Sequence, residues 1–244
     1  MRNTLIITFV LIFLFAYFKF GNSDVSETVA PTPIEMTEPH DQASYSYNIK
    51  YVDDVSQLKL ISNLDDRRAT FEIIDECRFL VNGGFYSKEY SHIGLLISEY
   101  QTISEYQSNN TFNGFIYFDT NNAPHISSSV PTSVRVALQS GPVIMIDSKY
   151  TKLRLANDKD ARRVLAATTN DDKLAFMIIY KSNSQLSGPL LADLPTVLDD
   201  IQQKESIEFV SAINLDGGSA SAFYDGDTRF AESSIIGSYF CLTD

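Results

Sequence analysis

The residues best suited to chemistry lie near the C-terminus, where Asp216 follows an apolar segment and is itself followed by Gly217 and Gly218. The apolar segment, residues 210–215, is typical of a buried strand, and the end of such a strand is a common place for a reacting carboxylate. Two consecutive glycines let the backbone turn with positive φ and let a ligand approach the main chain. Successive N–H groups in such a turn can bind an anion. The same residues are also consistent with a simple turn in which Asp216 hydrogen-bonds its own loop.

Three further motifs precede this stretch. Residues 81–86 read Val-Asn-Gly-Gly-Phe-Tyr, residues 139–142 read Gln-Ser-Gly-Pro, and Arg163 opens an apolar segment that ends at Ala167. With the Asn-Leu-Asp-Gly-Gly-Ser-Ala-Ser stretch of residues 214–221, these motifs resemble the signature of the phosphodiester glycosidase family, in the same order. The resemblance extends from about residue 75 to the C-terminus.

Two positions depart from the family pattern. Ser219 stands where the family often has a third glycine, and Ala167 stands where the arginine motif usually ends in glycine. Neither departure removes a charged group, so the resemblance still implies the activity and leaves the choice of substrate open.

The resemblance implies an enzyme that cleaves the bond between sugar C1 and oxygen in a glycosyl phosphodiester. The leaving group is a phosphate monoester, which needs little help from an acid. The protein must then hold the anion, stabilise an oxocarbenium-like sugar and guide water or a carboxylate nucleophile. We predict that Asp216 is the catalytic carboxylate, as base, nucleophile or electrostatic stabiliser. Arg163 is the predicted phosphate clamp, because a guanidinium offers paired donors to phosphate oxygens. Arg162 should point to the opposite face of the strand, so only one arginine should enter the site.

Further residues of the motifs are predicted to bind substrate. Side-chain amides can hold sugar hydroxyls, and glycines can turn backbone amides toward a ligand. For Asn82 and Gln139 the alternative is an amide that only holds a turn. The predicted substrate-binding residues are Asn82, Gly83, Gly84, Gln139, Asn214, Gly217, Gly218 and Ser219.

Two other functions remain open at this stage. One is a non-catalytic domain of the same fold that binds carbohydrate or another envelope component. The other is a phosphodiesterase that cuts the P–O bond, usually with metal ions. The sequence carries no His pair at ligand spacing and no calcium-loop pattern, so no metal or cofactor is predicted. Ser219 and Ser221 lack a motif-placed histidine base, which argues against a serine hydrolase.

The charge composition restricts the kinds of molecule that the protein can bind. The chain has 31 acidic and 19 basic residues, a net charge of −12, and this disfavours nucleic acid because phosphate contacts need clustered Lys and Arg. The expected partner is a glycosyl phosphodiester or a phosphate-containing polysaccharide. Such a substrate requires a local positive spot in an acidic protein, which makes individual arginines informative.

The N-terminal part of the chain indicates export. Residues 4–18 are uncharged and mostly apolar, between Arg2 and Lys19. A helix of this length spans about 22 Å, short of the ~30 Å hydrocarbon core, so residues 1–20 are either a signal peptide or an uncleaved anchor. Residues 21–44 are polar, acidic and proline-bearing, as a disordered linker would be. We therefore predict an exported protein, anchored facing outward or periplasmic or secreted, with one globular domain over residues 45–244.

The elements that position the motifs are mainly strands. Alternating or continuous apolar segments predict strands throughout residues 45–242, among them 45–52, 78–81, 174–180 and 210–215. One helix is clear, because Leu194, Val197, Leu198 and Ile201 repeat at helical spacing, with Asp193 as its expected N-cap. The pattern predicts an α+β domain with a large mixed, twisted sheet.

The two cysteines, Cys77 and Cys241, allow one disulfide in an exported chain. Two buried free thiols are the alternative.

Overall fold

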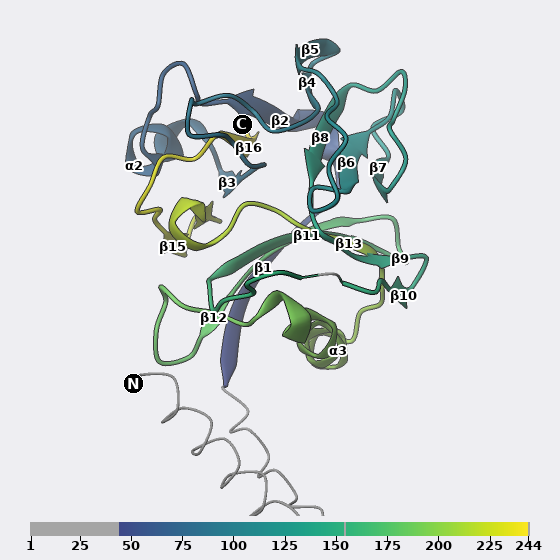
Figure 1. Ribbon diagram of the computed structural model, residues 1–244, viewed down its shortest axis with the longest axis vertical. Helices are drawn as coiled ribbons and strands as arrows, with labels where there is room; N and C mark the ends of the chain where they lie inside the picture. Colours follow the sequence, from purple (N-terminus) through teal and green to yellow (C-terminus); the bar gives the residue numbers. More distant parts are fainter. Residues whose placement is uncertain (1–43, 154, 244) are drawn as a thin grey trace, which may run out of the picture. The chain divides into compact units, whose positions relative to one another are not determined.

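The computed structural model describes residues 44–153 and 155–243 (Figure 1). The predicted export segment and almost all of the predicted linker lie outside these residues, so both stay predictions. Within the described ranges, no helix combines the length and the apolar character needed to cross a membrane.

The largest element is a six-stranded sheet in the order β1-β12-β11-β13-β9-β10, with antiparallel neighbours. Its strands are β1 (Tyr45–Val52), β9 (Val143–Ile146), β10 (Lys149–Tyr150), β11 (Arg163–Thr169), β12 (Leu174–Lys181) and β13 (Phe209–Asn214). The predicted strands at 45–52, 174–180 and 210–215 are all found here.

Two smaller antiparallel sheets have five strands each. We call the first the β3 sheet; it contains β15 (Arg229–Phe230), β14 (Phe223–Tyr224), β3 (Phe79–Asn82), β16 (Ser238–Leu242) and β2 (Leu58–Ser62). We call the second the β8 sheet; it contains β5 (Gln101–Ser104), β4 (Leu96–Ser98), β8 (Val136–Ser140), β6 (Gly114–Phe118) and β7 (Pro124–Ser127).

Helices are few and short. The α-helices are α2 (Thr70–Ile73) and α3 (Leu194–Glu205), and the 3-10 turns are η1 (Val55–Gln57), η2 (Ile74–Glu76), η3 (Leu191–Asp193) and η4 (Gly218–Ala220). The apolar residues of α3 are buried at the predicted spacing. Asp193 occupies the N-cap position as predicted, but its side chain makes no capping hydrogen bond, and η3 leads directly into the helix.

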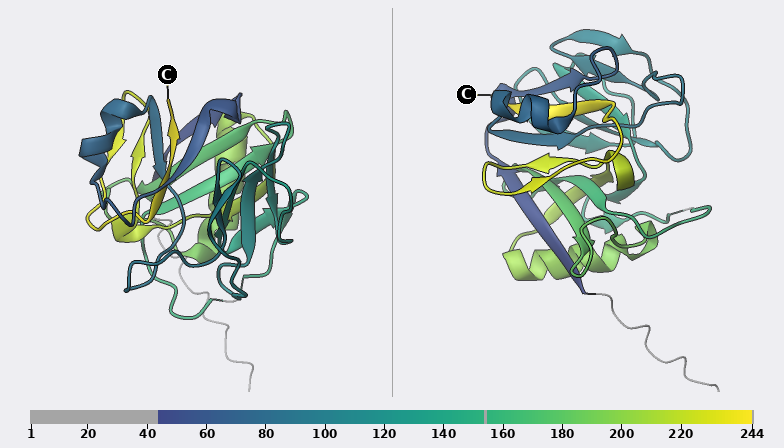
Figure 2. Two further views of the ribbon diagram at one scale, coloured as in Figure 1. Left: turned by 90° about the horizontal axis from the view of Figure 1, so that it is seen from above. Right: turned by 90° about the vertical axis from the view of Figure 1, so that its left-hand side faces the viewer.

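The three sheets and α3 form layers. The β3 and β8 sheets lie beside one another over one face of the six-stranded sheet, and α3 covers its other face (Figures 1 and 2). Strand β11 is apolar from Val164 to Ala167 because both of its faces are covered. Val164 and Ala166 pack in the core shared by the three sheets, whereas Leu165 and Ala167 pack in the core under α3.

The fold is therefore mostly β, and the prediction of one large mixed sheet was wrong. All strand pairs of the described chain are antiparallel and they divide into three sheets. The strand pattern could not reveal this because partners are distant in sequence. For example, β1 pairs with β12 and β3 pairs with β16.

A disulfide joins the chain just before β3 to the neighbouring strand β16. Cys77 and Cys241 are bonded and lie 164 residues apart in sequence, and no cysteine of the described chain is free. The sulfurs pack with Ile73, Leu80 and Ile236. The alternative of two free thiols is thus wrong.

Candidate active site

The Asp216 loop, residues 216–221, begins just after β13 and lies against the start of β11. The Leu215 N–H donates to the Val164 carbonyl (2.8 Å), and the Gly218 N–H donates to the Arg162 carbonyl (2.8 Å). These bonds continue the β11–β13 ladder beyond the last paired residue of β13. The arginine motif and the Asp-Gly-Gly motif are therefore neighbours.

The end of β3 holds the Asp216 loop from a second side. The Asp216 N–H donates to the Gly83 carbonyl (3.0 Å), and Asn82 Nδ2 donates to the Asp216 carbonyl (2.6 Å). Asn82 Oδ1 accepts from the Ala222 N–H (2.9 Å), just after the loop. Asn82 thus binds the main chain at both ends of the loop.

The Gln-Ser-Gly-Pro motif adjoins the loop through Asn214. Ser140 Oγ and the Gly141 N–H both donate to the Asn214 carbonyl, at 2.8 and 3.0 Å. The Asn214 N–H donates to the Pro142 carbonyl (3.0 Å), and Asn214 Nδ2 donates to the Gly141 carbonyl (3.0 Å). All four sequence motifs therefore meet around Asp216.

The predicted amide ligands are largely occupied by the protein itself. Gln139 is buried; its Oε1 accepts from the N–H groups of Leu95 (3.0 Å) and Gln107 (3.2 Å), and its Nε2 donates to the carbonyls of Gln107 and Phe112. The side-chain amide of Asn82 is likewise hydrogen-bonded to the main chain, at Asp216 and Ala222. These contacts favour the turn-holding alternative for both residues. Asn214 differs, because its buried Oδ1 has no hydrogen-bond partner among the described residues.

Three of the four predicted glycines, Gly83, Gly84 and Gly217, lie in close packing. A Cβ on Gly83 would lie 2.4 Å from Ser238 Oγ, and a Cβ on Gly217 would lie 2.8 Å from the Arg162 carbonyl oxygen. Their amides also have protein partners. The Gly84 N–H donates to Ser238 Oγ (3.1 Å) and the Gly217 N–H donates to Asp216 Oδ1 (2.8 Å). Gly218 has a φ of +61°, which favours glycine. A role of these amides in substrate binding stays a prediction.

Asp216 is partly exposed, yet protein atoms surround most of its carboxyl group. Burial raises its pKa from 3.8 to about 7, and the hydrogen bond from the Gly217 N–H acts in the opposite direction. The carboxyl group therefore changes its charge near neutral pH, as groups with a role in proton transfer or charge stabilisation often do.

Arg163 is buried, and its guanidinium is bound by segments outside the Asp216 loop. Nε donates to the Pro189 carbonyl (2.9 Å), and Nη2 donates to Asp158 Oδ1 (3.2 Å) and to the Lys159 carbonyl. Burial lowers the pKa of Arg163, and the charge of Asp158 raises it. These contacts show an arginine whose charge already has a carboxylate partner. Its predicted contact with phosphate stays a prediction.

Arg162 is the arginine whose side chain contacts the loop. Its Nε donates to Ser221 Oγ (2.6 Å), and its Nη2 donates to the carbonyls of Ser221 (2.7 Å) and Ala231 (2.7 Å). The two adjacent arginines thus have separate sets of partners, as expected for neighbours on opposite faces of a strand. Ser221 belongs to the Asp-Gly-Gly motif, but its contact with Arg162 was not predicted from the sequence. The only signal was an extra arginine beside the motif and a serine three residues after Gly218.

A model of the phosphodiester glycosidase family matches residues 75–236. The chain belongs to this family. A comparison with curated proteins finds no match.

Two solved structures have a similar fold. The catalytic domain of zebrafish N-acetylglucosamine-1-phosphodiester alpha-N-acetylglucosaminidase superposes with a TM-score of 0.56 at 12% identity, over 84% of this chain and 85% of that one. A hypothetical protein from Synechocystis gives a TM-score of 0.56 at 11% identity, over 83% of this chain and 60% of that one. At these identities the likeness concerns the fold.

Hydroxyl groups surround the loop in this member of the phosphodiester glycosidase family. Ser219 is exposed, and its Oγ accepts from Ser234 Oγ (2.9 Å), while its carbonyl accepts from the N–H groups of Ser233 and Ser234. Tyr86 donates its hydroxyl to the Ile235 carbonyl (2.8 Å). Burial raises the pKa of Tyr86; Ser234 lowers it and the Asp216 charge raises it. Ser234 and Tyr86 therefore extend the polar surroundings of Asp216 beyond the predicted residues.

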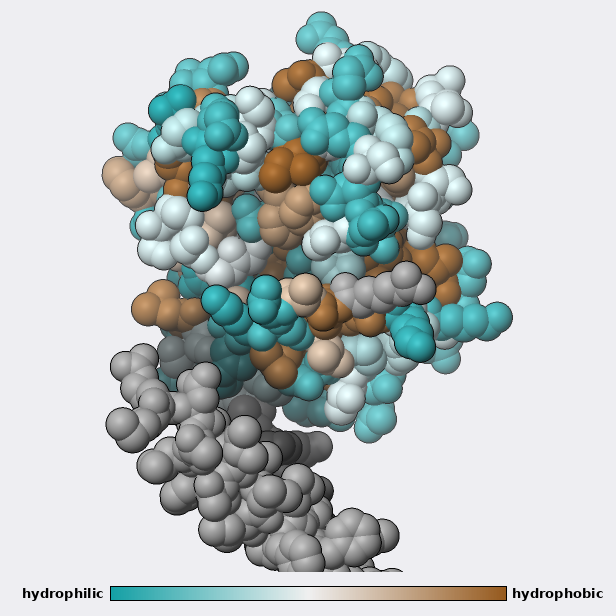
Figure 3. All heavy atoms as spheres, in the orientation of Figure 1, coloured by the Kyte–Doolittle hydropathy of each residue, from teal (hydrophilic) through white to brown (hydrophobic). Residues whose placement is uncertain are grey.

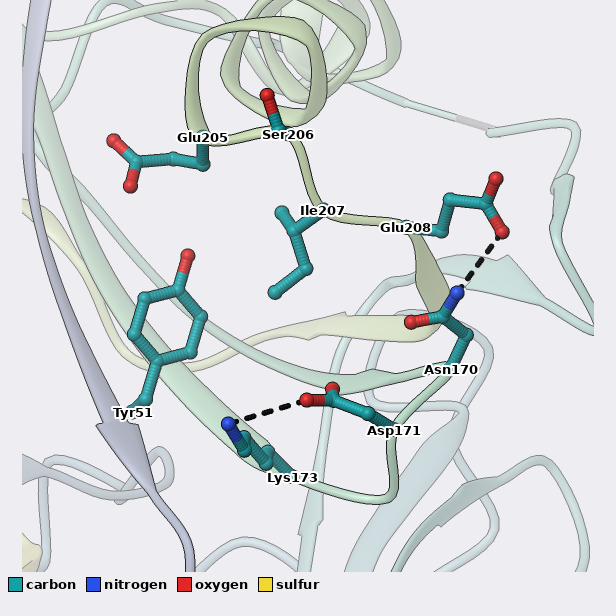
Figure 4. Close-up of a pocket in the computed structure, with 8 residues that line it drawn as sticks. All are labelled: Tyr51, Asn170, Asp171, Lys173, Glu205, Ser206, Ile207 and Glu208. Carbon is teal, nitrogen blue, oxygen red and sulfur yellow. Dashed lines mark hydrogen bonds and ion pairs between the residues drawn. The ribbon is translucent and has the colours of Figure 1, made fainter.

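A separate hollow of about 430 Å³ lies at the other end of β11 from the family motifs (Figure 4). Its lining comes from β1, the turn between β11 and β12, and the chain after α3: Tyr51, Asn170, Asp171, Lys173, Glu205, Ser206, Ile207 and Glu208. Its carboxylates outnumber its one lysine, which pairs with Asp171 (3.2 Å). This surface is unsuited to a phosphate group.

On the face seen in Figure 3, hydrophilic residues predominate and hydrophobic ones form small patches. In the described part of the chain, no group of three or more His, Cys, Asp or Glu residues is placed to hold a metal ion.

Proposed function

We propose that this domain hydrolyses the bond between sugar C1 and oxygen in a glycosyl phosphodiester and releases the sugar and a phosphate monoester. Family membership supports the reaction class, since the family description is phosphodiester glycosidase. The observation that carries the proposal is Asp216, a partly exposed carboxyl group at the junction of all four motifs with a pKa of about 7.

Asp216 acts in its ionised form. A phosphate monoester leaves readily, so the reaction needs negative charge near C1 more than it needs an acid. A carboxylate with little surrounding water stabilises an oxocarbenium-like centre more strongly than a solvated one does. The same group can act as base toward water or as nucleophile.

Arg163 is the proposed phosphate partner. Because its Nε and Nη2 already donate to Pro189, Asp158 and Lys159, a phosphate oxygen would be bound through Nη1. Ser219, whose hydroxyl is exposed, is the proposed partner of the sugar or of a second phosphate oxygen. The proposed natural substrate is an envelope or extracellular glycan, in keeping with the export predicted from residues 1–20.

The pH dependence tests the role of Asp216. We expect kcat/KM to rise about tenfold per pH unit up to about pH 7 and to level off above it, because only the ionised carboxylate is active. Steady-state kinetics from pH 5 to 9 with one soluble sugar-phosphate diester would measure this. A rate that falls as the pH passes through 7 would instead assign Asp216 the role of an acid.

The bond that breaks is tested with a panel of sugar-phosphate diesters in water labelled with oxygen-18. We expect the label on sugar C1 and none in the phosphate. Label in the phosphate would make the protein a phosphodiesterase. Saturable binding of the diesters without turnover would make it a carbohydrate-binding domain.

A further inference from the structure

Arg162 binds the Asp216 loop at two separated points. Its carbonyl accepts from the Gly218 N–H (2.8 Å) near the start of the loop. Its guanidinium donates from Nε to Ser221 Oγ (2.6 Å) and from Nη2 to the Ser221 carbonyl (2.7 Å) at the end of the loop. One residue therefore sets the distance between the two ends of η4.

Ser221 connects these two points within the loop. Its Oγ accepts from Arg162 Nε and donates to the Gly218 carbonyl (2.6 Å). Gly217 packs so closely on the Arg162 carbonyl that a Cβ would lie 2.8 Å from it. The backbone of residues 217–218, next to Asp216, is thus held directly by the Arg162 carbonyl and indirectly, through Ser221, by the Arg162 guanidinium.

The same guanidinium also holds the chain segments that flank the loop. Nη2 donates to the Ala231 carbonyl (2.7 Å) and Nη1 donates to the Gln185 carbonyl (3.1 Å). Just after Ala231, the N–H groups of Ser233 and Ser234 donate to the Ser219 carbonyl. Arg162 therefore joins three segments that are distant in sequence around one short loop.

The buried guanidinium of Arg162 is well suited to holding the loop. Arg162 is only 3% exposed, and burial lowers its pKa, so the buried charge needs several acceptors to offset desolvation. Four of its hydrogen bonds in the described chain go to three carbonyls and one hydroxyl. A planar guanidinium holds such acceptors in a fixed geometry, whereas the ammonium of a lysine does not.

We propose that Arg162, acting through Ser221, is a positioning residue that fixes the Asp216 loop and thereby the place and the dry surroundings of the Asp216 carboxylate. This inference rests on the proposed function for its catalytic consequence. It assigns the positioning role to Arg162 and leaves contact with phosphate to its neighbour.

The test compares Arg162→Lys and Ser221→Ala with two controls away from the loop. Arg162→Lys keeps the positive charge but removes the planar guanidinium with its fixed donor geometry. The variant therefore separates the effect of the charge from the effect of positioning. Arg135→Lys is the matched control, because Arg135 is also buried and donates to the carbonyls of Val55 and Leu58. Ser98→Ala matches Ser221→Ala, since Ser98 Oγ donates to the Leu60 carbonyl (2.6 Å).

We expect Arg162→Lys to lower kcat by at least ~30-fold, and Ser221→Ala by about tenfold, with KM changed less than threefold, because small displacements of a reacting group are costly. The controls should keep the wild-type kcat per folded molecule even where they lower the melting temperature. Equal kcat in Arg162→Lys, Ser221→Ala and the controls would overturn the inference.

A second readout needs no substrate. The Asp216 carboxyl can be titrated by carbon-13 NMR in the full chain, with Asp216→Asn to assign its signal. We expect a looser loop to admit water and lower the midpoint by about one pH unit in Arg162→Lys and Ser221→Ala. Two other titratable groups interact with these residues. Burial and the charge of Asp216 raise the pKa of Tyr86 above its usual 10.0, whereas burial lowers the pKa of Arg162 and the charge of Glu232 raises it.

The kinetic and NMR measurements distinguish a failure of the proposed function from a failure of the positioning role of Arg162. If the wild type cleaves no diester, the proposed function fails, while the NMR midpoints still decide whether Arg162 positions Asp216. If the Asp216 midpoint is the same in the wild type and in both loop variants, the positioning role is refuted. Should Arg162→Lys fail to fold, Ser221→Ala carries the same comparison.

Discussion

Arg162 and Arg163 are adjacent, of the same type and almost equally buried, at 3% and 8% exposure, yet they belong to different networks. Arg162 binds carbonyls and a hydroxyl of the Asp216 loop and its flanks. Arg163 binds Asp158, Lys159 and Pro189. One step along an extended chain sends side chains to opposite sides, so a motif match to an arginine needs the structure to show what that arginine touches.

The largest expected effect among the tests of this comparison comes from Arg163→Ala. If Arg163 binds the phosphate, the variant should raise KM for a diester at least ~10-fold, with some loss of kcat as charge develops on the leaving group. Inhibition by the uncharged sugar should stay unchanged. Kinetics with the diester and with the free sugar as inhibitor measure both effects. Unchanged KM for the diester would make Arg163 a structural residue only.

Asp158→Asn tests whether the ion pair limits Arg163. Removing the carboxylate frees the guanidinium for phosphate, so KM for the diester should fall about two- to fivefold. Stability should fall by about 1–3 kcal/mol, because Asp158 also accepts from the N–H groups of Leu191 and Ala192. Urea unfolding and steady-state kinetics on the same preparation check the two changes. A KM that rises would mean that Asp158 orients Arg163 toward the substrate.

A third test concerns the stability cost of burying the Asp216 carboxyl group. Burial raises its pKa from 3.8 to about 7, so the folded state holds a proton that the unfolded chain releases between these values. The stability from this group is complete below about pH 4 and is lost as the pH rises to about 7, with an upper bound of about 4 kcal/mol. Asp216→Asn should therefore unfold at a higher urea concentration than the wild type at pH 8 and at a similar one at pH 4. Equal midpoints at pH 8 would mean that the carboxylate is well solvated.

Several elements of the fold could be predicted from the sequence, because buried positions of a helix or strand form a recognisable pattern of apolar residues. Helix α3 follows from the spacing of Leu194, Val197, Leu198 and Ile201, and β12 from its continuous apolar run. The division into three sheets was not readable, since pairing depends on contacts between strands far apart in the chain.

The candidate site was readable only in part. The four motifs are visible in the sequence, whereas their contacts around Asp216 and the partners of each side chain depend on the fold. Asn82 and Gln139 illustrate this. The same Asn or Gln residue can bind a sugar or hold a turn, and the sequence does not distinguish the two roles. Arg162 lies beside the arginine motif and Ser221 is the last residue of the Asp-Gly-Gly motif, and their contact forms only when β11 and the loop are adjacent.

The most direct test of the central claim is the turnover of Asp216→Asn with a sugar-phosphate diester that the wild type cleaves. Asparagine keeps the size and can still accept from the Gly217 N–H, but it carries no charge. We predict that kcat falls at least ~100-fold while KM changes less than threefold, the scale expected when an acid–base or electrostatic catalyst is lost. A variant with wild-type kcat would contradict the assignment of Asp216 as the catalytic carboxylate.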